Sequence, residues 1–134
     1  MMSSGAREGS SGLTLDAGAL IAFERGDRAM LALLVVARQR RRAIVAPAGV
    51  VAQVWRNGKK QARLAQLLGS DAVEVEPFTD ERARGAGQLL GLTGTSDIVD
   101  AAVVLCARRR KQVVVTSDPD DIARLDPELP VVRV

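Results

Sequence analysis

Four aspartates occupy positions at which a folded chain can bring their carboxylates together. Asp16 follows the short apolar segment "LTL", and Asp118 follows the valine-rich segment "QVVVT". Asp97 and Asp100 open another apolar segment and share one face if that segment is a helix. Ligands of parallel α/β sheets bind outside the carboxyl ends of the strands, where all four acids could converge. The pattern therefore predicts an acidic site at one edge of a sheet.

A cluster of carboxylates needs a positive partner, because like charges at close range raise each other's pKa. Mg²⁺ and Mn²⁺ are hard cations that prefer oxygen ligands and would relieve this repulsion. The chain contains no histidine, which excludes Ser-His-Asp and Cys-His nucleophile systems and histidine-containing zinc sites. If the chain is an enzyme, we expect carboxylates and a divalent metal to carry its chemistry.

Each aspartate also has a purely structural interpretation. Asp16 and Asp97 can cap or favour the start of a helix, and Asp118 can cap the turn that follows it. Asp100 is the hardest to explain in this way, because it lies in the most apolar predicted helix, where an unpaired carboxylate is costly. The acids at 120–121 are expected to be solvated residues of a first helical turn.

The composition indicates one globular domain. The 134 residues are 47% hydrophobic, which excludes a disordered chain. Aromatic residues make up only 2%, which disfavours the base-stacking surfaces of single-strand binders. The net charge of +3 is compatible with a polyanionic partner. Cys106 is the one cysteine; it has no partner for an internal disulfide and is interpreted as inert core.

The ends and longest apolar runs give an expectation for localisation. Residues 1–12 are small and polar, and we interpret them as a flexible tail or an expression remnant that precedes a single domain at 13–134. The longest apolar run, residues 29–37, is far too short to span a membrane. Together with the single cysteine, this predicts a soluble, cytoplasmic protein.

Strand-like and helix-like segments alternate along the domain. The predicted strands are 13–15, 43–46, 72–77, 112–116 and 131–134. The predicted helices are 17–25, 27–41, 47–57, 59–68, 79–92 and 97–110, with Ser96 as the N-cap of the last and a short turn or helix after 116. Valine-rich strands without polar alternation favour a sheet covered on both faces. We predict a single α/β domain with a mostly parallel four- or five-stranded sheet and helices on both faces.

Four motifs occur in a characteristic order: "LTLDAGALIAFE", "APAGVVAQVWR", "SDIVDAAVVLCARRR" and "VVVTSDPDDIARL". Together they span residues 13–125 and resemble PIN-domain ribonucleases and, within them, the VapC-type toxins of toxin–antitoxin pairs. The Asp-Ala step at 100–101, followed by a strand and "TSD", is the most specific part. The resemblance implies a Rossmann-like PIN fold, a homodimer and Mg²⁺-dependent endoribonuclease activity against cellular RNA. It also implies a cognate antitoxin protein that wraps the toxin and blocks its acidic pocket.

Position by position, the resemblance assigns the metal-binding acids to Asp16, Asp100 and Asp118, with Asp97 as an accessory catalytic acid. A metal held by these acids, Mg²⁺ or in its place Mn²⁺, would lower the pKa of a bound water and neutralise charge on the scissile phosphate. Asp97 could then orient the attacking water as a general base. Thr116 and Ser117 could position a carboxylate or a metal-bound water. Alternatively, they only form the turn after the strand.

The resemblance fails at Gln53. The family pattern places a catalytic glutamate at this position, and glutamine keeps the length and a carbonyl oxygen but loses the charge. Three explanations stay open: a naturally weakened enzyme, a deliberate inactivating substitution, or compensation by Asp97 or another acid such as Glu24. We hypothesise that Gln53 faces the pocket and lowers its affinity for metal. The rival function is a PIN-fold binding module that engages RNA or an antitoxin without cutting.

Further segments have two interpretations each. The basic runs 38–42, 56–63 and 108–111 could guide RNA toward the acids, but two of them end helices, where cations complement the dipole. The apolar segments 29–37 and 98–107 could supply a dimer interface or an antitoxin groove, although plain core is simpler. A phospho-acceptor receiver domain is a third possible class. It expects two adjacent acids after the first strand, where this chain has Asp16 alone.

Overall fold

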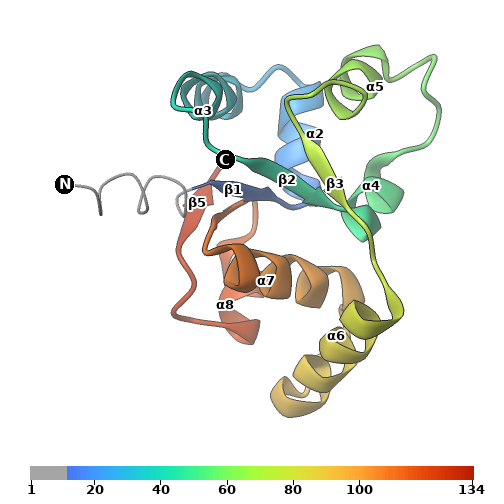
Figure 1. The fold of residues 1–134 in the computed structure, drawn as a ribbon, viewed down its shortest axis with the longest axis vertical. Helices are drawn as coiled ribbons and strands as arrows, with labels where there is room; N and C mark the ends of the chain where they lie inside the picture. The colour runs from blue at the N-terminus through green and yellow to red at the C-terminus, as the bar shows by residue number, and fades with distance from the viewer. Residues whose placement is uncertain (1–11) are drawn as a thin grey trace.

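A five-stranded parallel sheet forms the centre of the molecule (Figure 1). The computed structural model describes residues 12–134, so the predicted tail lies outside the described residues except for Gly12. The strand order is β3-β2-β1-β4-β5, and all neighbours pair in parallel. The strands are β1 (Leu13–Leu15), β2 (Ile44–Pro47), β3 (Glu74–Glu76), β4 (Val113–Thr116) and β5 (Val131–Arg133). This confirms the predicted fold class, with the fifth strand present.

Helices cover both faces of the sheet. The described part of the chain contains α2 (Ala17–Glu24), α3 (Arg28–Gln39), α4 (Ala48–Val54), α5 (Ala62–Leu68), α6 (Asp80–Thr93), α7 (Ile98–Arg110) and α8 (Pro119–Leu125). In Figure 1, α2, α3 and α5 lie above the sheet, and α7 and α8 lie below it. α4 contacts both α2 and α7, so it lies where the two layers meet.

The core is aliphatic, as the composition predicts. β1 and β2 are buried along their whole length, and the side chains of Val114 and Val115 in β4 are fully buried. α7 packs against β1, β2 and β4 and buries most of its apolar residues there. Most of segment 98–107 is therefore core, and Ile98 at its start is exposed. Burial raises the pKa of the Cys106 thiol to about 11, so this residue is an unreactive thiol at neutral pH.

The chain changes direction across the sheet between β1 and β4. From β1 it adds β2 and β3 on one side, and then returns to add β4 and β5 on the other. Leu15 is in register with Val115, and the N–H of Asp16 donates to the carbonyl of Val115 at 3.1 Å. The carboxyl ends of these two strands are thus side by side at the switch point of the sheet, where ligands of such folds bind.

Several element ends differ from the prediction. α7 is capped by Asp97 rather than Ser96, because the Asp97 carboxylate accepts the hydrogen bond from the third residue of the helix. Pro47 ends β2 instead of lying in the first turn of α4. α4 stops at Val54 because Gln61, whose amide donates to the Val54 carbonyl at 2.8 Å, ties down the loop that follows.

Within residues 12–134, no single helix is long and apolar enough to cross a membrane. α6 and α7 pass that test only as a pair, and the pair is bent by 107°.

Candidate active site

Three helices begin at the carboxyl edge of β1 and β4, and an aspartate caps each of them. Oδ1 of Asp16 accepts a hydrogen bond from the backbone of α2 at 2.9 Å. Oδ1 of Asp97 accepts from the N–H of Asp100 at 2.9 Å, and Oδ1 of Asp118 accepts from the N–H of Asp121 at 3.4 Å. Each cap uses Oδ1, so Oδ2 of each carboxylate is left to face other groups at this edge.

Asp100 is the acid on which the cluster acts most strongly. Its pKa is raised to about 6, mainly by burial and then by the charges of Asp97, Asp121, Asp16 and Asp118, in that order. An acid feels the charges of its neighbours in this way only when they are close and poorly screened by water. The structure therefore brings the four predicted acids to one site and adds Asp121.

Asp121 is the residue that the sequence interpretation missed. Its position in the first turn of a short helix predicted only a solvated side chain; the side chain is 40% exposed, but it also lines the hollow beside Asp100 and its charge raises the pKa of that acid. The missed signal is its spacing from Asp118: three positions along a helix start place both acids on the same side of α8. By contrast, Asp120 is exposed, as predicted.

Thr116 connects two of the acids. It is fully buried at the end of β4, and its hydroxyl oxygen accepts from the N–H of Asp118 at 2.9 Å. The same hydroxyl hydrogen-bonds to Asp16, which lowers the pKa of that carboxyl, although burial raises it more and the net pKa is raised. Thr116 thus holds Asp16 and Asp118 in a fixed relation.

Ser117 has a packing role at this edge. A Cβ on Gly18 would lie 2.0 Å from the Ser117 hydroxyl oxygen, so only glycine fits in the first turn of α2. The missing side chain lets the end of β4 approach the start of α2. Ser117 itself is exposed.

A hollow of about 260 Å³ opens beside Asp100 between the starts of α7 and α8. It is lined by Thr95, Ser96, Asp97, Asp100, Asp121, Arg124 and Leu125. Its walls are thus mostly acidic and hydroxylic, with one cation. This is the accessible face of the acidic site.

The donor set fits a hard divalent cation chemically, since it consists of carboxylate oxygens whose mutual repulsion a cation would relieve. Burial is the main cause of the raised pKa of Asp100, and repulsion by the neighbouring carboxylates adds to it. Across residues 12–134, however, no three acidic or cysteine side chains converge closely enough to form a ready-made metal site. The acids are near enough to affect one another, and a metal would have to draw them closer.

Gln53 is exposed on α4 and does not line the hollow beside Asp100. One turn earlier on the same helix, Gly49 lies against Val99, the neighbour of Asp100, so this face of α4 is turned toward the start of α7. Glu24, the suggested substitute, lies at the far end of α2 from Asp16 and accepts hydrogen bonds from Gln61.

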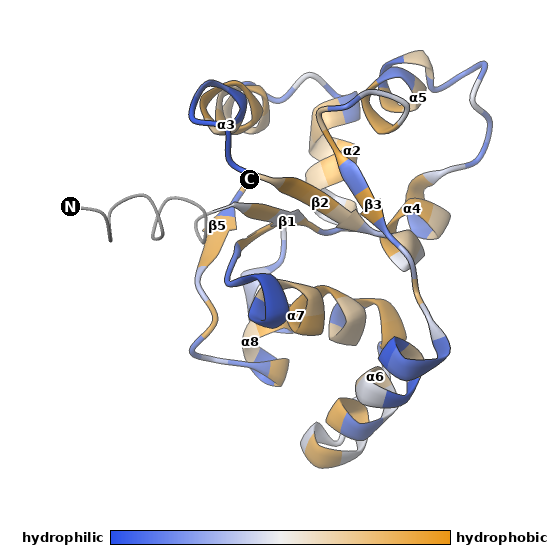
Figure 2. Ribbon diagram, in the orientation of Figure 1, coloured by the Kyte–Doolittle hydropathy of each residue, from blue (hydrophilic) through white to orange (hydrophobic). Residues whose placement is uncertain are grey.

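Two of the three basic runs, 38–42 and 108–111, end helices and appear as dark blue turns in Figure 2, whereas the run 56–63 lies between α4 and α5 and enters α5. Arg108 pairs with Asp126, and Arg109 and Arg110 pair with glutamates of β3, so this run ties α7 to its neighbours. The run 38–42 leads into the amino end of β2, the sheet edge opposite the acids. Neither run is placed to guide RNA to Asp100.

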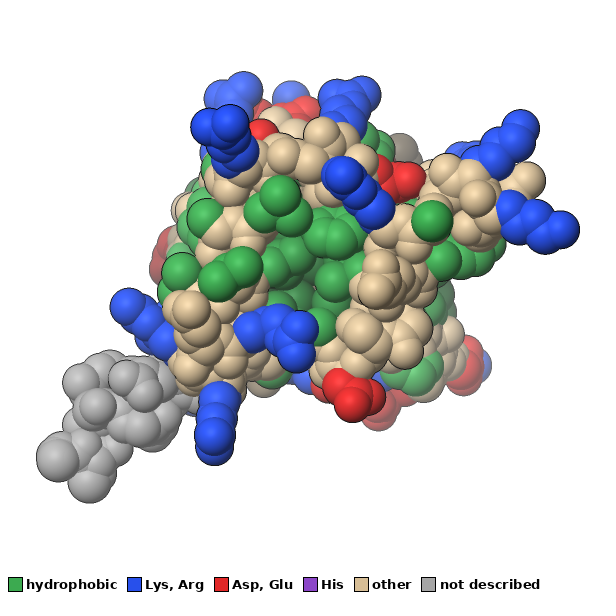
Figure 3. All heavy atoms as spheres, turned by 90° about the horizontal axis from the view of Figure 1, so that it is seen from above, with side chains coloured by type: hydrophobic (Ala, Val, Ile, Leu, Met, Phe, Trp, Pro, Cys, Tyr) green, Lys and Arg blue, Asp and Glu red, His purple; other side chains and the backbone are tan. Residues whose placement is uncertain are grey.

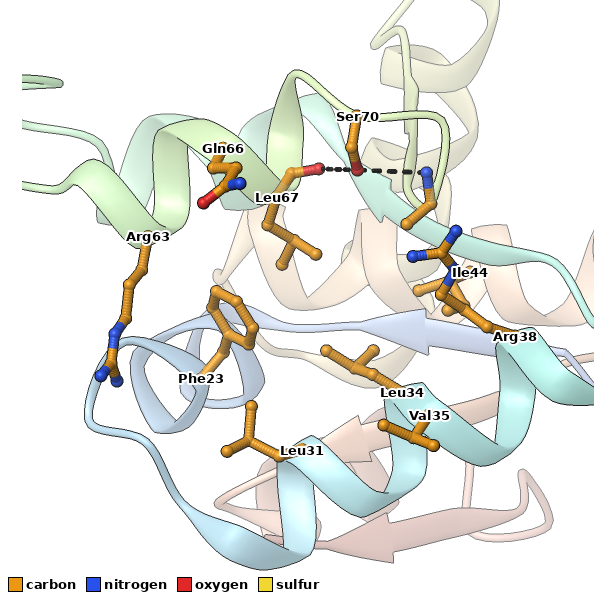
Figure 4. A pocket seen from close by; sticks show the side chains of 11 residues that line it. Phe23, Leu31, Leu34, Val35, Arg38, Ile44, Arg63, Gln66, Leu67 and Ser70 are labelled. Carbon is orange, nitrogen blue, oxygen red and sulfur yellow. Dashed lines mark hydrogen bonds between the residues drawn. The ribbon is translucent and has the colours of Figure 1, made fainter.

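A second, apolar groove of about 330 Å³ lies on the other face of the molecule, among α2, α3 and α5. Figure 3 shows its hydrophobic floor framed by Lys and Arg side chains. In Figure 4, Arg63 and Arg38 stand on opposite sides of Phe23 and Leu34. The segment 29–37 thus buries one face in the core and lines this groove with another.

Comparison with known proteins agrees with the fold and with the order of the motifs. The family model described as PIN domain matches residues 13–127, which is most of the chain. No curated protein matches the chain.

Proposed function

Because the chain belongs to the PIN-domain family, whose members are typically metal-dependent nucleases, we propose that it is an Mg²⁺-dependent endoribonuclease. The observation that carries the proposal is the raised pKa of Asp100, which four other aspartates at the carboxyl edge of the sheet help to produce. Carboxylates that bind no cation repel one another and are usually kept apart. Here the aspartates lie close together beside an open hollow that a cation can enter.

In this proposal, Asp16 and Asp118 would hold the metal through the oxygens that their capping bonds leave available, and Asp100 would hold it through a carboxylate that caps no helix. When bound there, Mg²⁺ or Mn²⁺ would supply a lowered pKa for a coordinated water and positive charge against the scissile phosphate. The buried hydroxyl of Thr116 hydrogen-bonds to both Asp16 and the backbone of Asp118 and so fixes their relative positions. Asp97, fixed to the start of α7 by its Oδ1, orients the attacking water through Oδ2 and accepts its proton.

The first test is cleavage of a labelled single-stranded RNA by the purified chain in Mg²⁺ and in EDTA. We expect cleavage in Mg²⁺ only, and loss of at least about a hundredfold in rate for Asp100→Asn. Asp80→Asn is the matched control, because Asp80 is an exposed acid of α6 in a surface ion pair. Equal rates for Asp100→Asn and the unchanged chain would refute the enzyme and leave the binding module.

We further propose that the protein is a cytoplasmic toxin whose antitoxin binds in the apolar groove. Leu31 and Val35 are exposed hydrophobic residues there, and Arg38 and Arg63 flank them, as Figure 4 shows. An amphipathic helix with apolar residues on one face and acidic residues at its ends is complementary to this surface. The groove lies away from Asp100, so a bound antitoxin would reach the acids with a second segment.

A homodimer is the third part of the proposal. The side chains of Leu92 and Ile98 are 86% and 55% exposed, and they flank the short turn between α6 and α7. Exposed aliphatic residues of this size favour a contact with another protein surface. Sedimentation equilibrium of the unchanged chain and of Leu92→Asp tests the homodimer. We expect the unchanged chain to be a dimer and the substitution to weaken it. A monomer in both cases would refute the homodimer.

A further inference from the structure

Arg124 is the one basic side chain that lines the acidic hollow in the described part of the chain. It lies on α8 opposite acids of α7, and its guanidinium pairs with Asp121. The proposed reaction assigns no role to a cation of the protein itself. RNA that enters the hollow would come close to the Arg124 guanidinium.

The backbone of Arg124 is fixed, whereas its head group is free to move. Its neighbours Ile122 and Leu125 are buried and anchor α8 to the core. The Arg124 side chain is 65% exposed and its partner Asp121 is 40% exposed. Ion pairs this exposed contribute little to stability, so the guanidinium can exchange Asp121 for another anion at little cost.

The acids make such a cation necessary for a polyanionic substrate. An RNA backbone that approaches Asp97, Asp100 and Asp121 is repelled, and the charge of a divalent ion held there would already be offset by several carboxylates. Guanidinium matches two phosphate oxygens with parallel N–H donors and is less strongly hydrated than ammonium. The hydroxyl of Ser96 on the same hollow adds a neutral donor.

The basic runs at the ends of α7 and α3 are not placed to bind a phosphate at the hollow. Arg108, Arg109 and Arg110 are held by acids of other elements. The run 38–42 lies at the opposite sheet edge from the site. Arg124 on α8 is the basic residue that lines the hollow itself.

We propose that Arg124 and Ser96 form a phosphate-binding position for single-stranded RNA on the rim of the acidic hollow. The inference rests on the proposed nuclease function and adds the residue that holds the substrate. Asp121 keeps the guanidinium aimed into the hollow until the RNA phosphate replaces it. Arg124 binds the RNA phosphate and takes no part in proton transfer.

The test measures RNA binding rather than cleavage, with every variant made in an Asp100→Asn background so that the RNA stays intact. Fluorescence anisotropy of a short single-stranded RNA in Mg²⁺ is read over a series of salt concentrations. We expect Arg124→Ala to weaken binding about tenfold and to reduce the slope of log K against log salt by about 0.7, the value for one phosphate contact. Arg124→Lys should keep the slope and recover part of the affinity.

Arg84→Ala is the matched control, because Arg84 also pairs with an acid of its own helix but lies on α6, outside the hollow. Equal affinity and slope for Arg124→Ala and Arg84→Ala would overturn the inference and leave the nuclease proposal standing. Tighter Mn²⁺ binding by Arg124→Ala with unchanged RNA affinity would also overturn it, and would make Arg124 a counter-ion of the acids. If the background protein binds no RNA at any salt concentration, the inference about Arg124 falls, whereas the nuclease proposal is decided separately by RNA cleavage with the unchanged chain.

Discussion

The backbone N–H of Asp100 donates a 2.9 Å hydrogen bond to Oδ1 of Asp97, and this bond gives the two acids of α7 different roles. Asp97 is held at the helix start by the bond that it accepts. Asp100, one turn on, has no such cap to serve and carries a pKa of about 6. The same bond that starts the helix therefore places a second negative charge beside Asp100.

Substitution of Asp97 separates its capping role from its charge. Asparagine keeps an oxygen that accepts the N–H of Asp100, whereas alanine does not and should cost about 1 kcal/mol of unfolding free energy. Both remove a neighbouring charge, so both should lower the pKa of Asp100. Urea unfolding and an NMR titration of the Asp100 carboxyl carbon measure the two effects. If asparagine destabilises as much as alanine, the hydrogen bond is not what holds this helix start.

The pKa of Asp100 predicts how stability depends on pH in the absence of metal. Its folded pKa of about 6 lies above the ordinary aspartate pKa of 3.8, so the folded state binds the proton more tightly between these two values. The free energy of unfolding should therefore fall as the pH rises from about 4 to about 6.

Asp100→Asn, which cannot ionise, isolates this contribution. In EDTA it should be more stable than the unchanged chain at pH 7.5, by about 1 kcal/mol once solvent screening of a partly exposed group is allowed for. The difference should vanish near pH 4. Urea unfolding at both pH values measures it, and a difference that is the same at both would assign it to packing rather than charge.

Much of the fold was predictable because it depends on local patterns. Buried parallel strands leave runs of valine and alanine, and helices between them leave amphipathic or apolar segments, so order and type of the elements followed. The convergence of Asp16 and Asp118 was predictable for the same reason, since the carboxyl ends of parallel strands share an edge. That Asp97 and Asp100 lie on the same side of α7 followed from their spacing of three residues and the helix period.

What the sequence did not predict depends on contacts between distant residues. Gln61 ends α4 from the far side of a loop, and no local rule places its amide on the Val54 carbonyl. Arg110 resembles an ordinary helix-end cation until its carboxylate partners on β3 are known. Asp121 resembles a solvated acid until α7 is placed against α8.

Gln53→Glu tests whether position 53 limits metal affinity. A carboxylate on this face of α4 would add an oxygen ligand with full charge, so Mn²⁺ should bind about tenfold more tightly by titration calorimetry. RNA cleavage should rise with it. Gln66→Glu is the control, because Gln66 is exposed on α5 and lines the apolar groove instead. If Gln53→Glu binds Mn²⁺ no better than the unchanged chain, Gln53 does not face the metal site.

The apolar groove can be tested with two neighbouring valines of α3. Val35 lines the groove, whereas Val36 is also exposed but lies outside it. A synthetic amphipathic helix with acidic ends should bind the unchanged chain, and Val35→Glu should weaken it about tenfold through charge repulsion and lost apolar contact. Val36→Glu should leave it unchanged in the same anisotropy titration. Equal loss in both variants would mean that the effect is not local to the groove.

The glutamate at the end of β3 makes the strongest stability prediction. The Glu76 side chain is only 4% exposed, and Arg109 and Arg110 both donate to it, with Arg82 nearby. Glu76→Ala would leave cations around an apolar cavity without their common anion, and it should cost about 3 kcal/mol of unfolding free energy.

Asp80→Ala provides the comparison for Glu76, because its pair with Arg84 is fully on the surface and should be worth less than about 1 kcal/mol. Urea unfolding of the two variants gives both numbers under one set of conditions. High salt should reduce the smaller effect and leave most of the larger one, since buried pairs are screened much less. Similar costs for the two would show that the arginines of α7 are free in solution, and the run 108–111 would again be available to bind RNA.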